Sequence, residues 1–415
     1  MASRQVHLGV RVVSDARAHH AIRAACGTAA AALALAVLAT GTASAAGQPV
    51  PPSTGAILSS SFSAVSVVPR SADAIAVGTI YGSSGRGRDL IEWWNGSKWT
   101  LMKPPAMPSS ANGSLSGVWV VSKSDAWAVG YESTGSPLLH WNGRAWSFSP
   151  VSGTPSGTSI SISAIEGSSA SNIWAVGGIY GNNGQSTPVE LHFDGTRWTA
   201  MEQGRSGLSL QSVAVVSPSL AWSVGGIYGN NGQSTPVVMK YNGTSWSALS
   251  TPAPKGAGLA AVSATGSIAW VVGCCSTNGP STDAFAMVWT GSKWETQKVP
   301  TPSGHPSIST VLALPGGTAW VAGSVGSTKG ESPFVDRFAK GKWTSSKLPA
   351  TGHASGYISG VAATGATNVW EVGAYWTGRI CQSPTAPLAY HYTTSWVLTK
   401  TVAPSGAATT AVPHC

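Results

Sequence analysis

The sequence has little charge for its length. Lysine, arginine, aspartate and glutamate make up 9% of its 415 residues, against about 25% in an average soluble domain. This scarcity argues against a coiled coil, a helix bundle and a charged disordered protein. No block of Lys or Arg and no basic helix occurs either, so we expect no nucleic-acid partner.

The sequence also lacks the short motifs of the common enzyme classes. It contains no G-x-S-x-G, no H-E-x-x-H and no phosphate-binding loop. Asp and Glu together number only 15, whereas a glycosidase needs two carboxylates at a set separation. No His, Cys or acid cluster has metal-ligand spacing. We therefore expect no metal and no cofactor, and the sequence identifies no catalytic residue.

Apart from the N-terminal segment, no apolar run approaches the length of a membrane span. Residues 1–26 carry four Arg and one Asp, an apolar run follows at 28–39, and Ala43-Ser44-Ala45 comes next. This order is typical of a secretory signal peptide, and the run falls short of the roughly 20 residues of a retained anchor. We expect residues 1–45 to be a signal peptide cleaved near Ala45, and the mature chain to be secreted without a membrane span.

Glycine, proline and tryptophan are abundant instead, with 50, 26 and 19 residues, which suits short strands joined by tight turns. Much of the tryptophan belongs to a repeat with two signatures. The first is Trp-x-Val-Gly or a close variant, at Ile75–Gly78, Trp127–Gly130, Trp174–Gly177, Trp222–Gly225, Trp270–Gly273, Trp320–Gly323 and Trp370–Gly373. The second pairs an aromatic residue and a nearby Trp across a turn, usually Asn-Gly, at Trp94–Trp99, Trp141–Trp146, Phe193–Trp198, Tyr241–Trp246, Trp289–Trp294, Phe338–Trp343 and Tyr392–Trp396.

The first signature recurs every 47 to 52 residues, and each unit divides into four strands, A to D. In the second unit these strands are 115–121, 126–131, 137–141 and 146–149. Asn-Gly between strands C and D predicts a type I′ turn, and we expect longer or irregular turns where the signal is weaker, at 338–343 and 392–396. A lone four-stranded sheet cannot bury both faces. The repeat therefore predicts an all-β fold, a seven-bladed β-propeller of four-stranded antiparallel blades with tryptophans packed between them.

The predicted domain organisation is simple. A Pro-rich lead at residues 46–55 precedes the propeller at residues 56–403, and a tail follows at 404–415. The blades span approximately 56–106, 107–153, 154–203, 204–252, 253–302, 303–351 and 352–403. Every unit contains four strands, so the ring need not borrow one to close, although residues 56–61 or the tail could add a strand.

The third unit, with IWAVGGIYGNN followed by FDGTRW, resembles a kelch repeat: apolar residues, a Gly-Gly doublet, an aromatic spacer and an outer-strand Trp. The doublet is complete at Gly177-Gly178 and Gly225-Gly226, and the resemblance extends over all units. It implies a kelch-like propeller, similar to the central domain of galactose oxidase and to secreted bacterial propellers.

Aromatic and amide side chains gather in the predicted B–C connections. Aromatic rings stack on the C–H faces of sugars, and amides bond sugar hydroxyls; loop packing and ordinary turn formation are the competing interpretation. The candidate ligand-binding residues are Tyr81, Tyr131, Tyr180, Asn182, Asn183, Tyr228, Asn230, Asn231, Tyr375 and Trp376.

Other titratable residues are interpreted as structural. His140, His192 and His391 occupy one repeat position, and equivalent positions in a ring diverge, so they do not predict a metal site. Glu371 takes the variable position of Trp-x-Val-Gly, where other units have Ala, Ser or Val. It is either a functional acid or, the reading we favour, a residue beside a wet central channel.

The predicted mature chain has four cysteines, an even number that suits an oxidising compartment. A Cys381–Cys415 disulfide would tie the tail to the last blade and contribute a few kcal/mol in the chain-entropy picture. It would leave Cys274 and Cys275 as an adjacent pair.

These features support three functions. The first is a secreted, non-catalytic module that binds a glycan or cell-surface polymer through the B–C connections. The second is a secreted carbohydrate-active enzyme with a pocket on the propeller axis. The third is an envelope scaffold that binds a protein. The scarcity of acidic residues, and the fact that the repeat accounts for most aromatic residues, favour the first and third functions over the enzyme.

Overall fold

The computed structural model describes residues 57–133, 136–152, 159–180, 186–201, 207–228, 234–276, 284–327, 330–353, 355–377 and 385–402. Within these ranges the secondary structure consists of β-strands and connections, as the sequence predicts. The predicted signal peptide, lead and tail lie outside the described residues. In the described part, no helix is long and apolar enough to cross a membrane.

The described strands pair in chain order into sheets, five of which are four-stranded and antiparallel. The first is β1 (Ile57–Val67), β2 (Ala74–Gly82), β3 (Gly87–Trp94) and β4 (Trp99–Leu101). The others are β14 (Leu208–Ser217), β15 (Leu220–Tyr228), β16 (Ser234–Tyr241), β17 (Trp246–Leu249); β18 (Ala257–Thr265), β19 (Ile268–Ser276), β20 (Phe285–Trp289), β21 (Trp294–Gln297); β22 (His305–Leu314), β23 (Thr318–Ser327), β24 (Gly330–Ala339), β25 (Lys342–Ser345); and β26 (Gly356–Gly365), β27 (Asn368–Trp376), β28 (Thr385–Tyr392), β29 (Trp396–Leu398).

The remaining strands form one nine-stranded sheet. They are β5 (Gly113–Ser122), β6 (Asp125–Glu132), β7 (Leu138–Trp141), β8 (Trp146–Phe148), β9 (Val151–Ser152), β10 (Ser159–Ser169), β11 (Asn172–Tyr180), β12 (Ser186–Phe193) and β13 (Trp198–Met201). The run β5–β8 joins the run β10–β13 through one residue pair, Tyr131 with Ser161. Strand β9 pairs with β13 in parallel at the outer edge.

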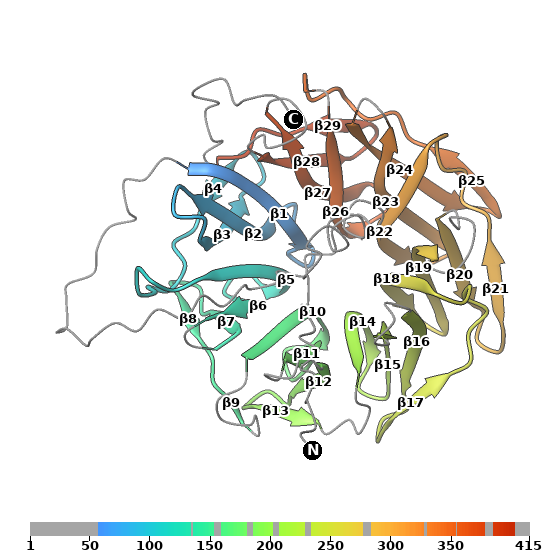
Figure 1. Ribbon diagram of the computed structural model, residues 1–415, viewed down its shortest axis with the longest axis horizontal. Coiled ribbons are helices and arrows are strands. Elements are labelled where there is room, and N and C mark those ends of the chain that lie inside the picture. Colours follow the sequence, from blue (N-terminus) through green and yellow to red (C-terminus); the bar gives the residue numbers. More distant parts are fainter. Residues whose placement is uncertain are drawn as a thin grey trace, which may run out of the picture.

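The sheets stand around a common axis (Figure 1), so the fold is a β-propeller. Strands β1, β5, β10, β14, β18, β22 and β26 lie nearest the axis, and β4, β8, β13, β17, β21, β25 and β29 lie at the outside. We call the ring end with the B–C and D–A connections the B–C end, and the opposite end the A–B end. The apolar clusters lie between neighbouring sheets, so each sheet buries both faces.

Paired tryptophans hold neighbouring four-stranded units together, which confirms the predicted role of this residue. Trp127 on a B strand meets Trp198 on the next D strand edge-on, with ring centroids 5.3 Å apart. The same contact joins Trp174 to Trp246, Trp222 to Trp294, Trp270 to Trp343, Trp320 to Trp396, and Trp370 to Trp99. Because the last pair joins the final sheet to the first, the packing continues around the ring.

The ring closes without a swapped strand in the described residues. The first sheet consists of β1 to β4 alone, and side chains join it to the last sheet. The Ser359 hydroxyl donates to the Phe62 carbonyl at 2.8 Å, and the Trp99 indole N–H donates to Thr399 Oγ1 at 3.0 Å. The sequence allowed residues 56–61 or the tail to add a strand. Within the described residues no such strand joins the first sheet, and residues 57–61 are part of β1.

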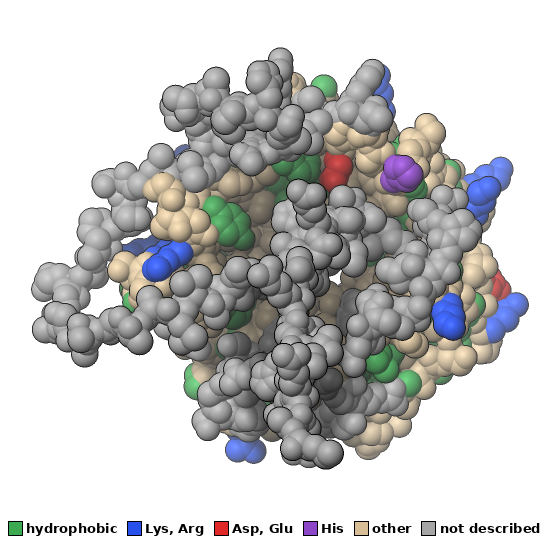
Figure 2. Space-filling view, in the orientation of Figure 1, with side chains coloured by type: hydrophobic (Ala, Val, Ile, Leu, Met, Phe, Trp, Pro, Cys, Tyr) green, Lys and Arg blue, Asp and Glu red, His purple; other side chains and the backbone are tan. Residues whose placement is uncertain are grey.

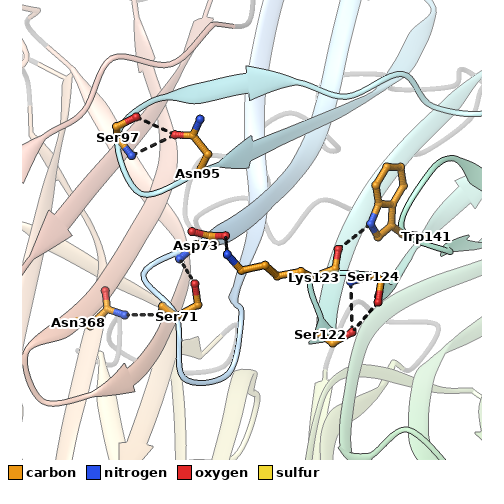
Figure 3. Close-up of polar contacts among 9 residues, drawn as sticks. All are labelled: Ser71, Asp73, Asn95, Ser97, Ser122, Lys123, Ser124, Trp141 and Asn368. Carbon is orange, nitrogen blue, oxygen red and sulfur yellow. Dashed lines mark hydrogen bonds and ion pairs between the residues drawn. The ribbon is translucent and has the colours of Figure 1, made fainter.

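Polar contacts also link neighbouring sheets at the A–B end (Figure 3). Lys123 Nζ lies 2.7 Å from Asp73 Oδ2, which joins two successive A–B turns. The Asn368 side chain donates to the Ser71 carbonyl, which joins the last turn to the first. Asp73 is buried, but the Lys123 side chain is 64% exposed, so we assign this ion pair a small share of the stability.

The glycine of each Trp-x-Val-Gly motif is required by an irregularity in the facing strand. Every A strand shifts register by one residue at the same point, for example between Phe62 and Ala64 opposite Gly78. At Gly78 a Cβ atom would overlap the Ser61 carbonyl oxygen, well inside the 3.0 Å limit of real Cβ contacts. The other motif glycines face the same overlap: Gly130, Gly177, Gly225, Gly273, Gly323 and Gly373.

The C–D turns differ from the prediction. A type I′ turn needs positive φ at two successive residues, but in Asn95-Gly96 only the glycine has it, at 92°. Residues 95–98 form a longer loop, in which Asn95 Oδ1 accepts the backbone N–H groups of Ser97 and Lys98 at 3.1 and 3.0 Å. Two successive positive φ angles, 52° and 75°, occur at Lys340-Gly341 instead, where the sequence predicted a longer or irregular turn.

Candidate functional site

The predicted aromatic residues lie at the ends of the B strands, not in the B–C connections. Strand B stays paired with strand C for three residues beyond the motif glycine, as far as Tyr81, Tyr180, Tyr228 and Trp376. These four share one repeat position, whereas Tyr131 and Tyr375 belong to two others. The loop placement is therefore wrong, because the strands are longer than the sequence pattern predicts.

Several of the predicted residues belong to segments outside the described part of the chain. Asn182, Asn183, Asn230 and Asn231 lie outside the described residues, as do the side chains of Tyr180 and Tyr228. Tyr131 is half-buried, and its backbone forms the link to Ser161. Among the described candidates, Tyr81 of the first sheet and Trp376 of the last lie at the junction of these two sheets.

Tyr357 of β26, which the sequence pattern does not single out, links two of the predicted residues. Its ring meets Trp376 edge-on, with centroids 5.4 Å apart. Its hydroxyl bonds the Ser61 side chain of the first sheet, and the Tyr81 phenol lies near enough for its ionisation to raise the pKa of Tyr357. We call Tyr81, Tyr357 and Trp376 the closure cluster.

The closure cluster combines apolar surface with hydroxyl groups that stay protonated. Tyr81 is 38% exposed. The other large hydrophobic side chains that are exposed in the described part are aliphatic. Burial raises the pKa of Tyr357 to about 12 and also raises the pKa of Tyr81. Both phenols therefore remain neutral donors at physiological pH.

A cavity of 310 Å³ lies at the same end of the ring, between the β22–β25 and β26–β29 sheets. Its lining includes Glu331, Ser332, Ser346, Thr351, His353 and Tyr390. Ser355, also in the lining, accepts the Glu331 N–H on its hydroxyl at 2.7 Å and the Trp376 N–H on its carbonyl at 3.0 Å. Because Trp370 and Val372 pack toward the first sheet, the alternation of β27 places Trp376 on that face and Tyr375 on the face toward the cavity. The cavity and the closure cluster thus lie at the same end of the ring, on opposite faces of the β26–β29 sheet.

The exposed His353 ring completes this region, because it stacks on Tyr375 with centroids 4.4 Å apart and an interplanar angle of 18°. Tyr375 is thus beside the cavity, and its ring already has one partner. In the view of Figure 2, most Lys and Arg side chains lie toward the outer edge of the ring.

Glu331 is the carboxylate of the cavity lining. Burial raises its pKa, and a hydrogen bond from the Ser324 hydroxyl opposes that rise. The ion pairs among the described residues are Lys123–Asp73, His140–Asp125, Arg197–Asp194 and Lys293–Glu295. Within the described residues Glu331 thus has no cationic partner.

A second group of acids lies between the first two sheets of the chain. Asp89 in β3 and Glu132 in β6 are 4% and 8% exposed, and their four carboxylate oxygens have no donor in the described part. The Arg88 guanidinium donates to the carbonyls of Pro108 and Ser109 at 3.2 and 2.7 Å. Burial raises the pKa of both acids, and the nearby charge of Asp89 adds to the rise at Glu132. The two carboxyls therefore share a proton.

This shared proton predicts that stability falls as pH rises. Because both folded pKa values lie above the unfolded ones, the contribution is complete below about pH 4 and is lost as pH rises from there. Glu132→Gln supplies a permanent donor to Asp89, so we expect it to stabilise the fold by about 1–2 kcal/mol at mildly alkaline pH and by much less in acid.

Urea denaturation across this pH range measures the effect. Glu295→Gln, which alters an acid whose side chain is 45% exposed on β21, is the control and should leave the pH profile unchanged. A Glu132→Gln protein that loses stability equally at every pH would contradict proton sharing.

The strand C histidines are structural, as the sequence indicates. His140 Nε2 lies 3.0 Å from Asp125 Oδ1, and its ring stacks on Trp127 at 4.2 Å. Equivalent contacts join His192 to Asn172 and Trp174, and His391 to Asn368 and Trp370. Within the described ranges, no group of three or more His, Cys, Asp or Glu could hold a metal ion.

Glu371 is buried in the protein, not placed beside a wet channel, so that expectation is wrong. Its exposed fraction is 0%, and neither carboxylate oxygen has a donor among the described groups. Trp370 and Val372 pack toward the first sheet, so the alternation of a strand directs Glu371 toward the β22–β25 sheet. Burial raises its pKa well above the ordinary range.

The predicted disulfides stay predictions. Cys274 is buried, and its Sγ lies 3.7 Å from Ser307 Oγ. The side chain of Cys275 and the whole of Cys381 and Cys415 lie outside the described residues.

No protein-family model and no curated protein matches this chain. Solved structures that do match include YCF48 bound to a D1 peptide, with 16% identity, a TM-score of 0.42, and coverage of 68% of this chain and 79% of that chain. YCF48 from Cyanidioschyzon merolae has 16% identity, a TM-score of 0.34, and coverage of 57% and 76%. The β-propeller domain of the Trilobed protease from Pyrococcus furiosus, with an open velcro topology, has 8% identity, a TM-score of 0.47, and coverage of 83% and 99%. These similarities concern the fold alone.

Proposed function

We propose that this protein is a secreted, non-catalytic module that binds a glycan or another cell-surface polymer at the B–C end of its propeller. The observation that carries the proposal is the presence of the closure cluster and the 310 Å³ cavity at the same end of the ring. Tyr81 offers an exposed ring, and Trp376 is half-buried next to it across Tyr357. Aromatic faces stack against the C–H groups of sugar rings, while hydroxyl-bearing side chains satisfy the sugar hydroxyls.

The cavity favours binding over hydrolysis. A glycosidase places two carboxyl groups about 5–10 Å apart around the bond it cleaves, and the residues that line this cavity include one acid, Glu331. The lining also offers the hydroxyls of Ser332, Ser346 and Thr351. A protein-binding envelope scaffold remains the competing function, and the binding measurements below separate the two.

The number of blades, the kelch-like type of the repeat and the secretion of the protein are part of the same proposal. We propose a kelch-like ring of seven blades, counting the nine-stranded sheet as two because one residue pair joins its two runs. The seven motif glycines support that number. Secretion rests on the N-terminal signal pattern of residues 1–45.

Replacement of Trp376 tests the proposed site. We expect Trp376→Ala to weaken glycan binding by about ten-fold or more, because a large aromatic contact contributes strongly to a binding surface. Trp141→Ala is the matched control: Trp141 is also partly exposed but lies at the A–B end. Both variants should lose a similar, modest amount of thermal stability. Equal glycan binding by the two variants would remove the closure cluster from the site.

A further inference from the structure

We infer that the ligand of the cavity carries a protonated amino group, which places amino sugars ahead of neutral sugars. The inference rests on the proposed function and names the chemical class of its ligand. It starts from Glu331, a half-buried carboxylate in the cavity wall with no ion-pair partner among the described residues.

A neutral ligand would leave this carboxylate in an unfavourable position. When a ligand fills the cavity, water is displaced from Glu331, and a desolvated charge without a partner costs free energy. The Ser324 hydroxyl satisfies one hydrogen bond of the carboxylate but supplies no positive charge. An ammonium group would supply both the charge and the donors that the carboxylate lacks.

The aromatic side chains beside Glu331 favour the same group. Phe334 and Tyr390 line the cavity together with Glu331, and the His353 ring of the same lining stacks on Tyr375. The faces of aromatic rings attract cations, more strongly when water is excluded. A sugar with an amino substituent could thus place its ring against the aromatic surface and its ammonium group near Glu331.

The hydroxyl groups of the lining distinguish this site from one in which aromatic rings alone surround an ammonium group. Ser332, Ser346 and Thr351 line the cavity together with Glu331, and each hydroxyl can donate and accept. Such a lining suits a ligand with several hydroxyls and one cationic substituent, which is the pattern of a hexosamine with a free amine.

Three tetrasaccharides with the same β-1,4 linkage test the inference: those of glucosamine, N-acetylglucosamine and glucose. Calorimetric titration of the whole protein near neutral pH should show glucosamine binding at least about ten-fold tighter than the other two, since one charge-assisted contact is worth that much. Glu331→Gln should abolish the difference by weakening the binding of glucosamine, while the neutral sugars should bind no more weakly than before, since the charge that they desolvate is removed. Glu295→Gln, on the outer strand β21, is the control and should retain the preference.

The outcomes separate this inference from the proposed function. Equal binding of all three sugars, or a preference for glucosamine that survives Glu331→Gln, would overturn the inference while the glycan site stands. If a correctly folded protein binds none of these sugars but binds other neutral glycans, the amino-group assignment is also wrong. Failure to bind any glycan would remove the proposed function together with the inference.

Discussion

Gly78→Ala is expected to destabilise the propeller by about 3 kcal/mol or more. The added Cβ would overlap the Ser61 carbonyl oxygen and approach the Phe62 Cα. Both are backbone atoms, so rotation of a side chain cannot relieve the overlap. The strands β1 and β2 would have to separate locally, which would also disturb the contact of Phe62 with Trp99.

Gly82→Ala provides a control on the same strand. Gly82 also belongs to β2, but a Cβ there meets no atom within 4 Å. We expect its free energy of unfolding to stay within about 0.5 kcal/mol of the original protein. Chemical denaturation measures both variants, and soluble yield reports the first if it does not fold. Similar stability for the two variants would show that the strand shift opposite Gly78 does not require glycine.

Glu371→Val is expected to act in the opposite direction and stabilise the protein by about 2 kcal/mol at neutral pH. Valine occupies the equivalent positions 271 and 321, where it is fully buried. Glu371 is equally buried but brings two carboxylate oxygens without a described donor. The substitution removes that penalty and leaves an apolar side chain of similar volume.

The gain from Glu371→Val should depend on pH. The folded pKa of Glu371 is raised by burial, so the native state holds a proton that the unfolded chain releases above about pH 4. Glu371 therefore adds a loss of stability as pH rises from that value toward its folded pKa, and the Glu371→Val protein lacks this loss. The difference between the two proteins should be small in acid and grow toward neutral pH.

Glu371→Gln separates titration from polarity at this position. It removes the proton equilibrium but keeps a buried polar group, so it should flatten the pH profile with a smaller gain than valine. Thermal or urea unfolding across the pH range measures all three proteins. A loss of stability in Glu371→Val at neutral pH would mean that the carboxylate has a favourable partner, which would contradict our account of this interface.

The repeat makes much of the fold predictable from the sequence. A period of 47 to 52 residues with two aromatic signatures predicts the strand order in each unit, because hydrophobic alternation and turn residues are local signals. It also predicts tryptophans between the sheets. The contact of each B-strand Trp with the next D-strand Trp, such as Trp127 with Trp198, follows from packing and is not visible in the period.

The turns show how a local rule fails. Asn-Gly favours a type I′ turn when two residues connect the strands, but here the strand pairing ends earlier and the asparagine side chain caps a longer loop. The motif glycines show the reverse case. Their pattern is obvious in the sequence, but its cause is a register shift in a strand about 15 residues earlier.

The candidate site was only partly predictable because ring closure assembles it. Tyr81 comes from the first sheet, and Tyr357 and Trp376 come from the last. A repeat identifies equivalent positions, but it does not reveal which non-equivalent residues meet where the two ends join. The pairing of Asp89 with Glu132 was not predictable either, because the two residues belong to different units and Asp89 has no motif of its own.

The most direct test of the proposed function is a glycan and polysaccharide array probed with the purified, folded protein beside Trp376→Ala. We predict that the original protein binds a coherent class of glycans and that the variant loses this binding while remaining folded. A blank array with the folded original protein would contradict a glycan site at the closure cluster, and it would favour a protein-binding scaffold instead.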